Sequence, residues 1–279
     1  MKLYQIQYKK IIEDALLEDF SRGGDLTTSA LIPKDAKGDT VLRARETGII
    51  AGLEAALYAF TVLDNSVKFK YYKRDGDKVS NGDKIVKISG NIQAMLSAER
   101  TCLNLLGRLS GIASFTKTLV DEIGGTGAEV ADTRKTTPGL RVLEKYAVKI
   151  GGGINHRFGL DDAVMIKDNH LAFSKNLTDA VRKVRSYVGH TVKIEVEVDT
   201  IKQLEELLKN PVDIVLLDNM TPEKLKEAVL LIDGKMITEA SGNISIETIR
   251  SVAESGVDII SSGALTHSVK NFDIGLDYS

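Results

Sequence analysis

The chain has 279 residues, of which 37 are basic and 39 acidic, so its formal charge at neutral pH is -2. This length suits one large domain or two modest ones, whose core needs no disulfide or metal to hold it together. A charge so close to zero excludes a surface-wide positive field and gives no support to nucleic acid or an anionic membrane as a partner. Any site for an anion must therefore be local.

The single cysteine, Cys102, rules out an internal disulfide and is typical of a reducing compartment. Its segment, TCLNLL, predicts a small buried residue rather than a nucleophile. The amino-terminal residues mix charge with apolar side chains and lack the unbroken apolar core of a signal peptide. No later stretch is long and apolar enough to span a bilayer. We therefore expect a cytoplasmic protein.

The amino-terminal part combines helices with short strands. Apolar residues at helical spacing predict one helix over 3–19, and GLEAALYAFTVL predicts another. Alternating apolar and polar residues predict strands at 41–46 and 67–74. Antiparallel strands mixed with helices in this way favour an α+β sandwich.

The segment DGDKVSNGDKIVKISG contains two turn signals that flank short strands. Its paired turns also resemble the hairpin of lipoyl and biotinyl carriers, which would make the chain a carrier or binding module. Such a carrier needs a modifiable lysine at the hairpin tip, whereas Asn81 and Gly82 occupy the second turn here. The segment is therefore predicted to be scaffold.

A long helix is predicted over 92–121. Arg100, Asn104, Gly107 and Gly111 recur at three- and four-residue spacing, so they share one face of this helix. The two glycines permit close approach of another backbone. Two interpretations remain open: the face packs tightly inside its own domain, or it carries Arg100 to a boundary between domains or subunits.

From residue 128 onward, apolar segments alternate with helical ones. Apolar strands that are each followed by a helix predict a parallel sheet covered on both faces, either open or closed as a barrel. The predicted strands are AEVADT (128–133), AVMIK (163–167), TVKIEVEV (191–198), DIVLLD (213–218), KMITEA (235–240) and VDIISS (257–262).

Helix boundaries can be predicted in three of the gaps. Pro138 is expected at the first position of one helix, which a run of three glycines at 151–153 ends. TPEKLKEAVLLI and SIETIRSVAESG are expected to begin with Ser or Thr caps.

Polar residues follow or end all six predicted strands. Ligands bind at the carboxyl ends of the strands in barrels and open parallel sheets alike. An isolated Asp or Ser after a strand is commonly only a helix cap, so the shared placement carries the prediction. The residues concerned are Arg134, Lys135, Lys167, Glu197, Asp218, Ser241, Gly242, Ser262 and Gly263.

This rim divides by charge. Its acids, Glu197 and Asp218, offer the hard oxygen ligands that Mg²⁺ prefers, although Glu197 as a structural partner of Lys167 or Arg134 remains an open alternative. The turns SGN and SGAL place backbone N–H groups where a phosphate can bind. The basic residues that predict a pocket for an anion are Arg134, Lys135, His156, Arg157 and Lys167.

Other kinds of site find no support. No GxGxxG follows a strand, and no glycine loop ends in Lys-Ser or Lys-Thr, so nucleotide binding of those two sorts is unsupported. The four histidines lack paired metal spacing. His190 is most simply a loop residue.

These segments closely resemble the quinolinate phosphoribosyltransferase family, the carboxylating nicotinate-nucleotide pyrophosphorylases of NAD synthesis. GGDLTT and MLSAERTCLNLLGRLSGIAS are similar to family segments as well, so the resemblance covers nearly the whole chain. Cys102 occupies a position that is often Ala in the family. The main matching motifs are TRKTTPGLRVLEKYAVKIGGGINHR, MIKDNH, EVEVDT, VLLDNM, EASGNIS and SSGALTHS.

The resemblance implies a fold and an assembly. The fold is an incomplete six-stranded α/β barrel joined to an amino-terminal α/β sandwich, and the assembly is a homodimer or a larger set of dimers. We expect the sandwich at 1–115 and the barrel at 116–265, with the tail 266–279 packed back on the sandwich.

The resemblance also implies a reaction, namely Mg²⁺-dependent transfer of phosphoribose from phosphoribosyl pyrophosphate to quinolinate with loss of CO₂. Arg134 and Arg157 resemble the clamps on the two quinolinate carboxylates, and His156, Lys135 and Lys167 line the same site. A paralogue linked to molybdate transport, acting on another ring acid, is the alternative.

The remaining site residues also come from the resemblance. Arg100 resembles a residue contributed by a neighbouring subunit. Glu197 and Asp218 resemble the pair that faces the ribose and the Mg²⁺-pyrophosphate, and His267 resembles a phosphate contact. The cradle for the 5-phosphate is Ser241, Gly242, Ser262 and Gly263.

Overall fold

The computed structural model describes residues 2–278, which fold into two compact units. The expected ranges 1–115 and 116–265 differ from these units. Residues 136–152 carry helix α5 and belong to the first unit, because a β-carbon on Gly151 would lie only 2.4 Å from the carbonyl oxygen of Ala113 on the preceding helix. The first unit takes Met1–Lys117, Thr136–Gly152 and Ser268–Ser279, and the second takes Thr118–Lys135 and Gly153–His267.

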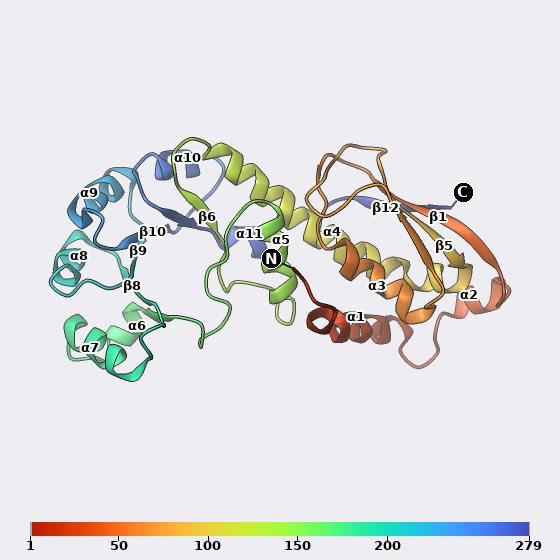
Figure 1. Ribbon diagram of the computed structural model, residues 1–279, viewed down its shortest axis with the longest axis horizontal. Coiled ribbons are helices and arrows are strands. Elements are labelled where there is room, and N and C mark those ends of the chain that lie inside the picture. Colours follow the sequence, from red (N-terminus) through yellow and green to blue (C-terminus); the bar gives the residue numbers. More distant parts are fainter. Residues whose placement is uncertain (1, 279) are drawn as a thin grey trace. The chain divides into compact units, whose positions relative to one another are not determined.

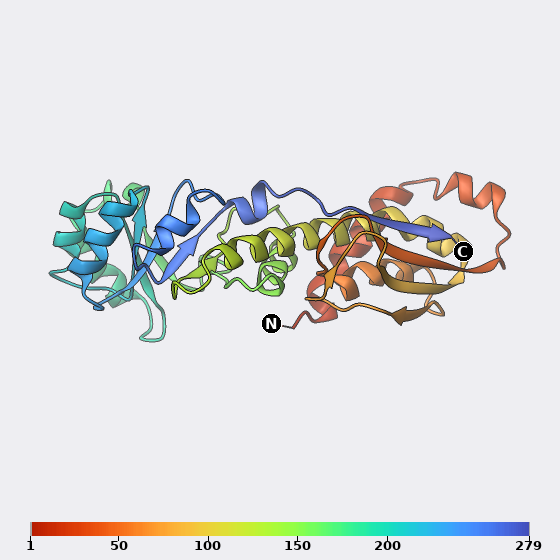
Figure 2. The ribbon, with the colours of Figure 1, turned by 90° about the horizontal axis from the view of Figure 1, so that it is seen from above.

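The first unit is built on a four-stranded antiparallel sheet in the order β12-β1-β5-β3, with helices beside it (Figure 1). Figure 2 shows β12, from the end of the chain, alongside β1. The helices are α1 (Gln5–Phe20), α2 (Leu26–Leu31), α3 (Leu53–Leu63), α4 (Ile92–Glu122) and α5 (Arg141–Ile150), and the strands are β1 (Lys37–Ala44), β2 (Gly48–Ile49), β3 (Lys68–Tyr71), β4 (Lys78–Val79), β5 (Lys84–Asn91) and β12 (Ile274–Tyr278).

The segment with two turn signals is scaffold, as predicted. Its longer strand, β5, pairs with β1 on one side and β3 on the other, so its backbone is hydrogen-bonded along both edges. Its short strand, β4, pairs with β2. Gly82 in the intervening turn has φ 90°, a conformation that glycine adopts without steric cost.

Helix α4 has the predicted extent, and its glycine face is explained within the first unit. A β-carbon on Gly107 would lie 2.8 Å from the carbonyl oxygen of Phe272, and one on Gly111 would lie 2.2 Å from that of Lys270. The glycines therefore admit the backbone of the chain's own carboxyl-terminal segment. Arg100 on the same face is exposed. Cys102 is buried as predicted, and burial raises the pKa of its thiol far above the ordinary value.

The second unit is an α/β barrel left open between β6 and β7. All five strand pairings are parallel, in the order β6-β11-β10-β9-β8-β7, and Figure 1 shows α8 and α9 on the outer side of the strands. The strands are β6 (Glu129–Ala131), β7 (Val164–Ile166), β8 (Ile194–Val198), β9 (Ile214–Asp218), β10 (Ile237–Ser241) and β11 (Ile259–Ser261). The helices are α6 (Asp168–Leu171), α7 (Leu177–Tyr187), α8 (Ile201–Leu207), α9 (Pro222–Ile232), α10 (Ile249–Ala253) and α11 (Ala264–His267).

Helix starts were predicted with mixed success. The Thr221 side chain accepts a hydrogen bond from the backbone N–H of Lys224 and caps α9, with Pro222 at its first position, as expected. The prediction that Pro138 begins a helix is wrong, because α5 begins at Arg141. The expected Ser or Thr cap of α10 is also wrong, since Thr248 precedes that helix in a helical conformation and makes no side-chain cap bond.

Among the described residues, none of the helices has the length and apolarity that a bilayer crossing requires.

Candidate active site

A cavity of about 640 Å³ opens at the carboxyl ends of the parallel strands in the second unit. All the residues that the sequence predicts at the carboxyl ends of the strands line this cavity, and so do His156 and Arg157 from the segment between β6 and β7. Arg100 belongs to the first unit and is not among the lining residues. The predicted residues that the cavity brings together are Arg134, Lys135, His156, Arg157, Lys167, Glu197, Asp218, Ser241, Gly242, Ser262, Gly263 and His267.

Two arginines, Arg134 and Arg157, line the cavity. Burial lowers the pKa of Arg157, and the neighbouring positive charge of Arg134 lowers it further. The Arg157 side chain is oriented by a 2.7 Å hydrogen bond from Nη1 to the carbonyl oxygen of Ala163. An anion with two carboxylates would relieve this repulsion, since each guanidinium can donate two parallel hydrogen bonds to one carboxylate.

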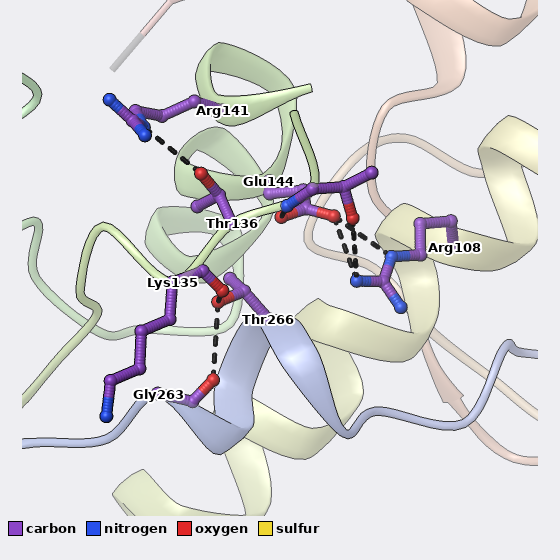
Figure 3. Close-up of polar contacts among 8 residues, drawn as sticks. Arg108, Lys135, Thr136, Arg141, Glu144, Gly263 and Thr266 are labelled. Atoms are coloured by element: carbon purple, nitrogen blue, oxygen red, sulfur yellow. Dashed lines mark hydrogen bonds and ion pairs between the residues drawn. The ribbon is translucent and has the colours of Figure 1, made fainter. Parts of the chain in front are cut away.

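The loop that carries Lys135 is anchored to the short helix α11, which follows β11 (Figure 3). The buried hydroxyl of Thr266 donates to the carbonyl oxygen of Lys135 at 2.8 Å and lies 3.3 Å from that of Gly263. A β-carbon on Gly263 would lie 2.7 Å from Cδ of Lys135 and 3.0 Å from Nε2 of His267. Glycine at this position therefore lets the two basic side chains lie across the turn.

The acids of the rim lie beside a lysine. Nζ of Lys167, at the end of β7, lies 2.5 Å from Oε2 of Glu197 on β8. Lys167 and Glu197 therefore form an ion pair at the cavity wall. Burial and the negative charge of Asp199 raise the pKa of Asp218, while Lys167 and Lys135 oppose that shift.

The turns after β9 and β10 are joined by hydrogen bonds. The backbone N–H of Asn219 donates to the carbonyl oxygen of Ser241 at 2.9 Å, and Nδ2 of Asn243 donates to Oδ1 of Asn219. Gly242 has φ 98°, and a β-carbon there would lie 2.2 Å from that same Oδ1. Only glycine fits this turn, which leaves its backbone accessible at the cavity wall.

Sequence analysis missed three buried acids around His156. Nε2 of His156 lies 3.0 Å from Oε2 of Glu195 and 3.7 Å from Oε1 of Glu239. The backbone N–H of His156 donates to Oδ1 of Asp132 at 2.9 Å. Strand alternation held the signal, because Glu195 lies two residues before Glu197 and Glu239 two before Ser241, and residues two apart share a face.

The chain matches two family models that together span most of it. Residues 112–277 match the quinolinate phosphoribosyl transferase C-terminal domain, and residues 25–110 match the N-terminal domain of the same family.

Individual relatives match over nearly the whole of this chain. The chain is 42% identical over 272 residues to a probable carboxylating nicotinate-nucleotide pyrophosphorylase of Bacillus subtilis, covering 98% of this chain and 93% of that protein. It is 44% identical to decarboxylating quinolinate phosphoribosyltransferase 2b of Nicotiana tabacum, covering 96% and 81%. The crystal structure of NadC from Streptococcus pyogenes superposes with a TM-score of 0.95 at 40% identity, covering 100% and 99%. The chain therefore belongs to the quinolinate phosphoribosyltransferase family.

Proposed function

We propose that the chain transfers phosphoribose from phosphoribosyl pyrophosphate to quinolinate, releasing CO₂ and pyrophosphate and giving nicotinate mononucleotide for NAD synthesis. One observation carries this proposal: paired arginines, paired acids and glycine turns line a single cavity. The names of the relatives agree with it. A paralogue acting on a ring acid with one carboxylate would leave one arginine without its anion, which disfavours that alternative.

The arginine side of the cavity suits the ring acid. Arg134 and Arg157 are close enough for the charge of one to lower the pKa of the other, and a dicarboxylate offers each of them a partner. His156, Lys135 and Lys167 line the same cavity and add positive charge around the reacting ring. We assign the arginines to the two carboxylates of quinolinate.

The acid side suits the ribose and a metal-bound pyrophosphate. Glu197 and Asp218 come from neighbouring strands, β8 and β9, and supply the carboxylate oxygens that Mg²⁺ prefers. Burial and the negative charge of Asp199 raise the pKa of Asp218, so a bound cation would stabilise its ionised carboxylate. These two residues would hold Mg²⁺, which would neutralise charge on the departing pyrophosphate.

The turns after β10 and β11 suit the 5-phosphate. Gly242 and Gly263 leave backbone N–H groups accessible beside the hydroxyls of Ser241 and Ser262. Successive N–H groups of this kind form anion-binding concavities. We assign the cradle of the 5-phosphate to these turns, with His267 as a further phosphate contact.

The protein contributes mainly position and charge to the chemistry. Fixing the ring and the ribose in one cavity brings the quinolinate nitrogen to the anomeric carbon, which develops oxocarbenium character as pyrophosphate leaves. The ring nitrogen then becomes cationic and acts as an electron sink. Loss of the adjacent carboxylate as CO₂ therefore needs little beyond firm holding of the other carboxylate and stabilisation of a transient ring carbanion.

The activity can be tested directly on purified protein. With Mg²⁺, quinolinate and phosphoribosyl pyrophosphate, we expect nicotinate mononucleotide, pyrophosphate and CO₂ in equal amounts. Nicotinate should replace quinolinate poorly, because it leaves one arginine without a carboxylate. Absence of product, or equal use of nicotinate, would reject the proposal.

We further propose a cytoplasmic homodimer, or a larger assembly of dimers, in which Arg100 completes the site of the neighbouring subunit. Arg100 is exposed, and the buried thiol of Cys102 suits a reducing compartment. Mixing inactive Arg100→Ala with inactive Lys167→Ala protein should restore activity, because some mixed dimers contain one intact site. No recovery after verified subunit exchange would reject a shared site.

A further inference from the structure

His156 forms a buried cluster with Glu195 and Glu239 beside the cavity, and the two glutamates have no role in the steps above. Both glutamates are only 2% exposed, and they come from β8 and β10. His156 and Glu239 line the cavity, whereas Glu195 does not. The three side chains therefore connect the barrel interior to the side of the cavity assigned to the ring acid.

The position of His156 is fixed at its backbone and its ring. Asp132, fully buried after β6, accepts from the His156 backbone N–H at 2.9 Å and from Nδ2 of Asn155 at 2.6 Å. Nε2 of the ring lies 3.0 Å from Oε2 of Glu195, a distance at which a carboxylate accepts a hydrogen bond. This contact requires the proton to sit on Nε2 when Glu195 is ionised.

Two adjacent buried carboxyls are costly to the fold. Burial raises the pKa of Glu239 to about 7, with Glu195 and Asp132 adding to the shift and His156 and a hydrogen bond to Ser261 opposing it. Within the described residues, Oε1 of Glu195 is buried and has no hydrogen-bond partner. Apolar side chains of similar size would pack a barrel interior at lower cost. The pair must therefore serve a purpose other than stability.

We infer that Glu239, together with Glu195, is a positioning residue for the ring acid: the two carboxyls hold the Nε2 edge of His156, so that the imidazole is preset for an anionic ring substituent. This inference rests on the proposed function. It predicts that the pair acts on substrate only through His156.

The same three ligand atoms lie within 4.8 Å of one another, which is also close enough for a divalent cation. We favour positioning, because the 3.0 Å contact between Nε2 and Glu195 already satisfies the ring nitrogen without an ion. Metal binding is therefore an outcome that the experiments must separate from positioning.

A double-mutant cycle tests the inference in steady-state kinetics. Glu239→Gln keeps the side-chain shape and should raise KM for quinolinate about tenfold, while KM for phosphoribosyl pyrophosphate and kcat stay within about twofold, as the loss of one oriented charged contact implies. In a His156→Gln background the same change should have less than about a twofold effect. Equal effects in both backgrounds, or equal rises of both KM values, would overturn the inference. Glu195→Gln takes the place of Glu239→Gln if that variant does not fold.

Nitrogen NMR of the unmodified protein gives a readout that does not depend on catalysis. The His156 ring signals, assigned by their loss in His156→Gln, should show a protonated Nε2 at neutral pH, and Glu239→Gln should shift them. An unprotonated Nε2 would overturn the inference. So would one equivalent of Zn²⁺ that binds the unmodified protein, fails to bind Glu239→Gln and competes with quinolinate, since the cluster would then be a cation site. If the unmodified protein makes no product, the proposed function fails while the NMR result still reports on positioning.

Discussion

The two units each have a hollow lined by charged side chains, and the charges are arranged differently. The hollow in the first unit, of about 280 Å³, includes Asp75, whose carboxylate accepts from the backbone N–H groups of Gly52 and Leu53 and from the hydroxyl of Tyr146. In the larger cavity of the second unit, burial and the positive charge of Arg134 lower the pKa of Arg157. Burial and a neighbouring acid raise the pKa of Asp218. A charged group whose hydrogen bonds are satisfied within the fold stabilises it. Charged groups that shift one another's pKa in a cavity indicate a ligand site.

The same contrast holds for the buried acids of the two units. Glu144 of α5 is fully buried, yet it accepts from Nε and Nη2 of Arg108 and from the backbone N–H of Thr137 (Figure 3). Glu195 of β8 is as deeply buried and keeps one oxygen without a hydrogen bond, among the residues described. The comparison predicts that mutations in the first unit change stability and that mutations at the cavity change kinetics.

The largest effect is expected for Glu144→Ala. Removing one partner of a buried ion pair typically costs about 3–5 kcal/mol of unfolding free energy. Denaturant titration should detect this loss, and Glu18→Ala, at an exposed position of α1, is the control. An unchanged midpoint would break the comparison, because the network of Glu144 would then contribute nothing to stability.

Glu197→Ala should mainly slow turnover. Removing a group that stabilises charge in the transition state costs about 3 kcal/mol, or on the order of a hundredfold in kcat. The change should leave KM for quinolinate within a fewfold, with the exposed Glu205→Ala of α8 as control. A raised KM for quinolinate at normal kcat would mean that the acid side was assigned to the wrong ligand.

Arg134→Ala should mainly weaken binding of quinolinate. Hydrogen bonds to charged groups are worth about 1.5–3 kcal/mol each, so KM for quinolinate should rise by about 10- to 100-fold. Arg182→Ala, which removes an exposed side chain on α7, should leave KM unchanged. A normal KM with slow turnover would reverse the roles of Arg134 and Glu197.

The buried pair should make stability depend on pH. Burial raises the folded-state pKa of Glu239 from 4.5 to about 7, so its carboxyl stays protonated in the folded protein at pH values where the unfolded chain is ionised. The free energy of unfolding is therefore highest below the unfolded pKa and falls by roughly 3 kcal/mol as the pH rises through the folded pKa. Glu239→Gln should not show this loss. Parallel pH profiles for the two proteins, measured by urea unfolding, would contradict the prediction.

The smallest effect is expected for Asp75→Asn. The amide keeps one acceptor oxygen, so one of the backbone N–H groups of Gly52 and Leu53 loses its partner and the negative charge at the amino terminus of α3 is lost, which costs about 1–2 kcal/mol. Unfolding should register a small loss, while kcat and both KM values stay unchanged. A kinetic defect would show that the hollow of the first unit takes part in catalysis.

The rim of the cavity could be predicted from the sequence because the carboxyl ends of parallel strands meet by construction. Lys167, Asp218 and Gly263 needed only the strand boundaries, which periodicity and glycines supply. Glu239 lies inside a predicted strand, where alternation places it on the same face as Ser241, but no local pattern predicts its burial beside His156.

Other features depend on contacts between distant segments. The grouping of α5 with the first unit rests on the close approach of Gly151 to Ala113, which no local pattern encodes. The failure at Pro138 has a local cause: Gly139 has φ 83° and delays the helix until Arg141. A proline that fits a first helical position also fits a turn.

The pairing of β12 with β1 has a consequence for how the protein is made. The edge strand β12 is encoded after the whole second unit. All the barrel strands have therefore left the ribosome before β1 can pair with β12. The amino-terminal sheet must therefore wait, with one edge open, while the later unit emerges. Exposed edges of this kind are where nascent chains associate wrongly. The first unit to be synthesised is thus the last to be finished.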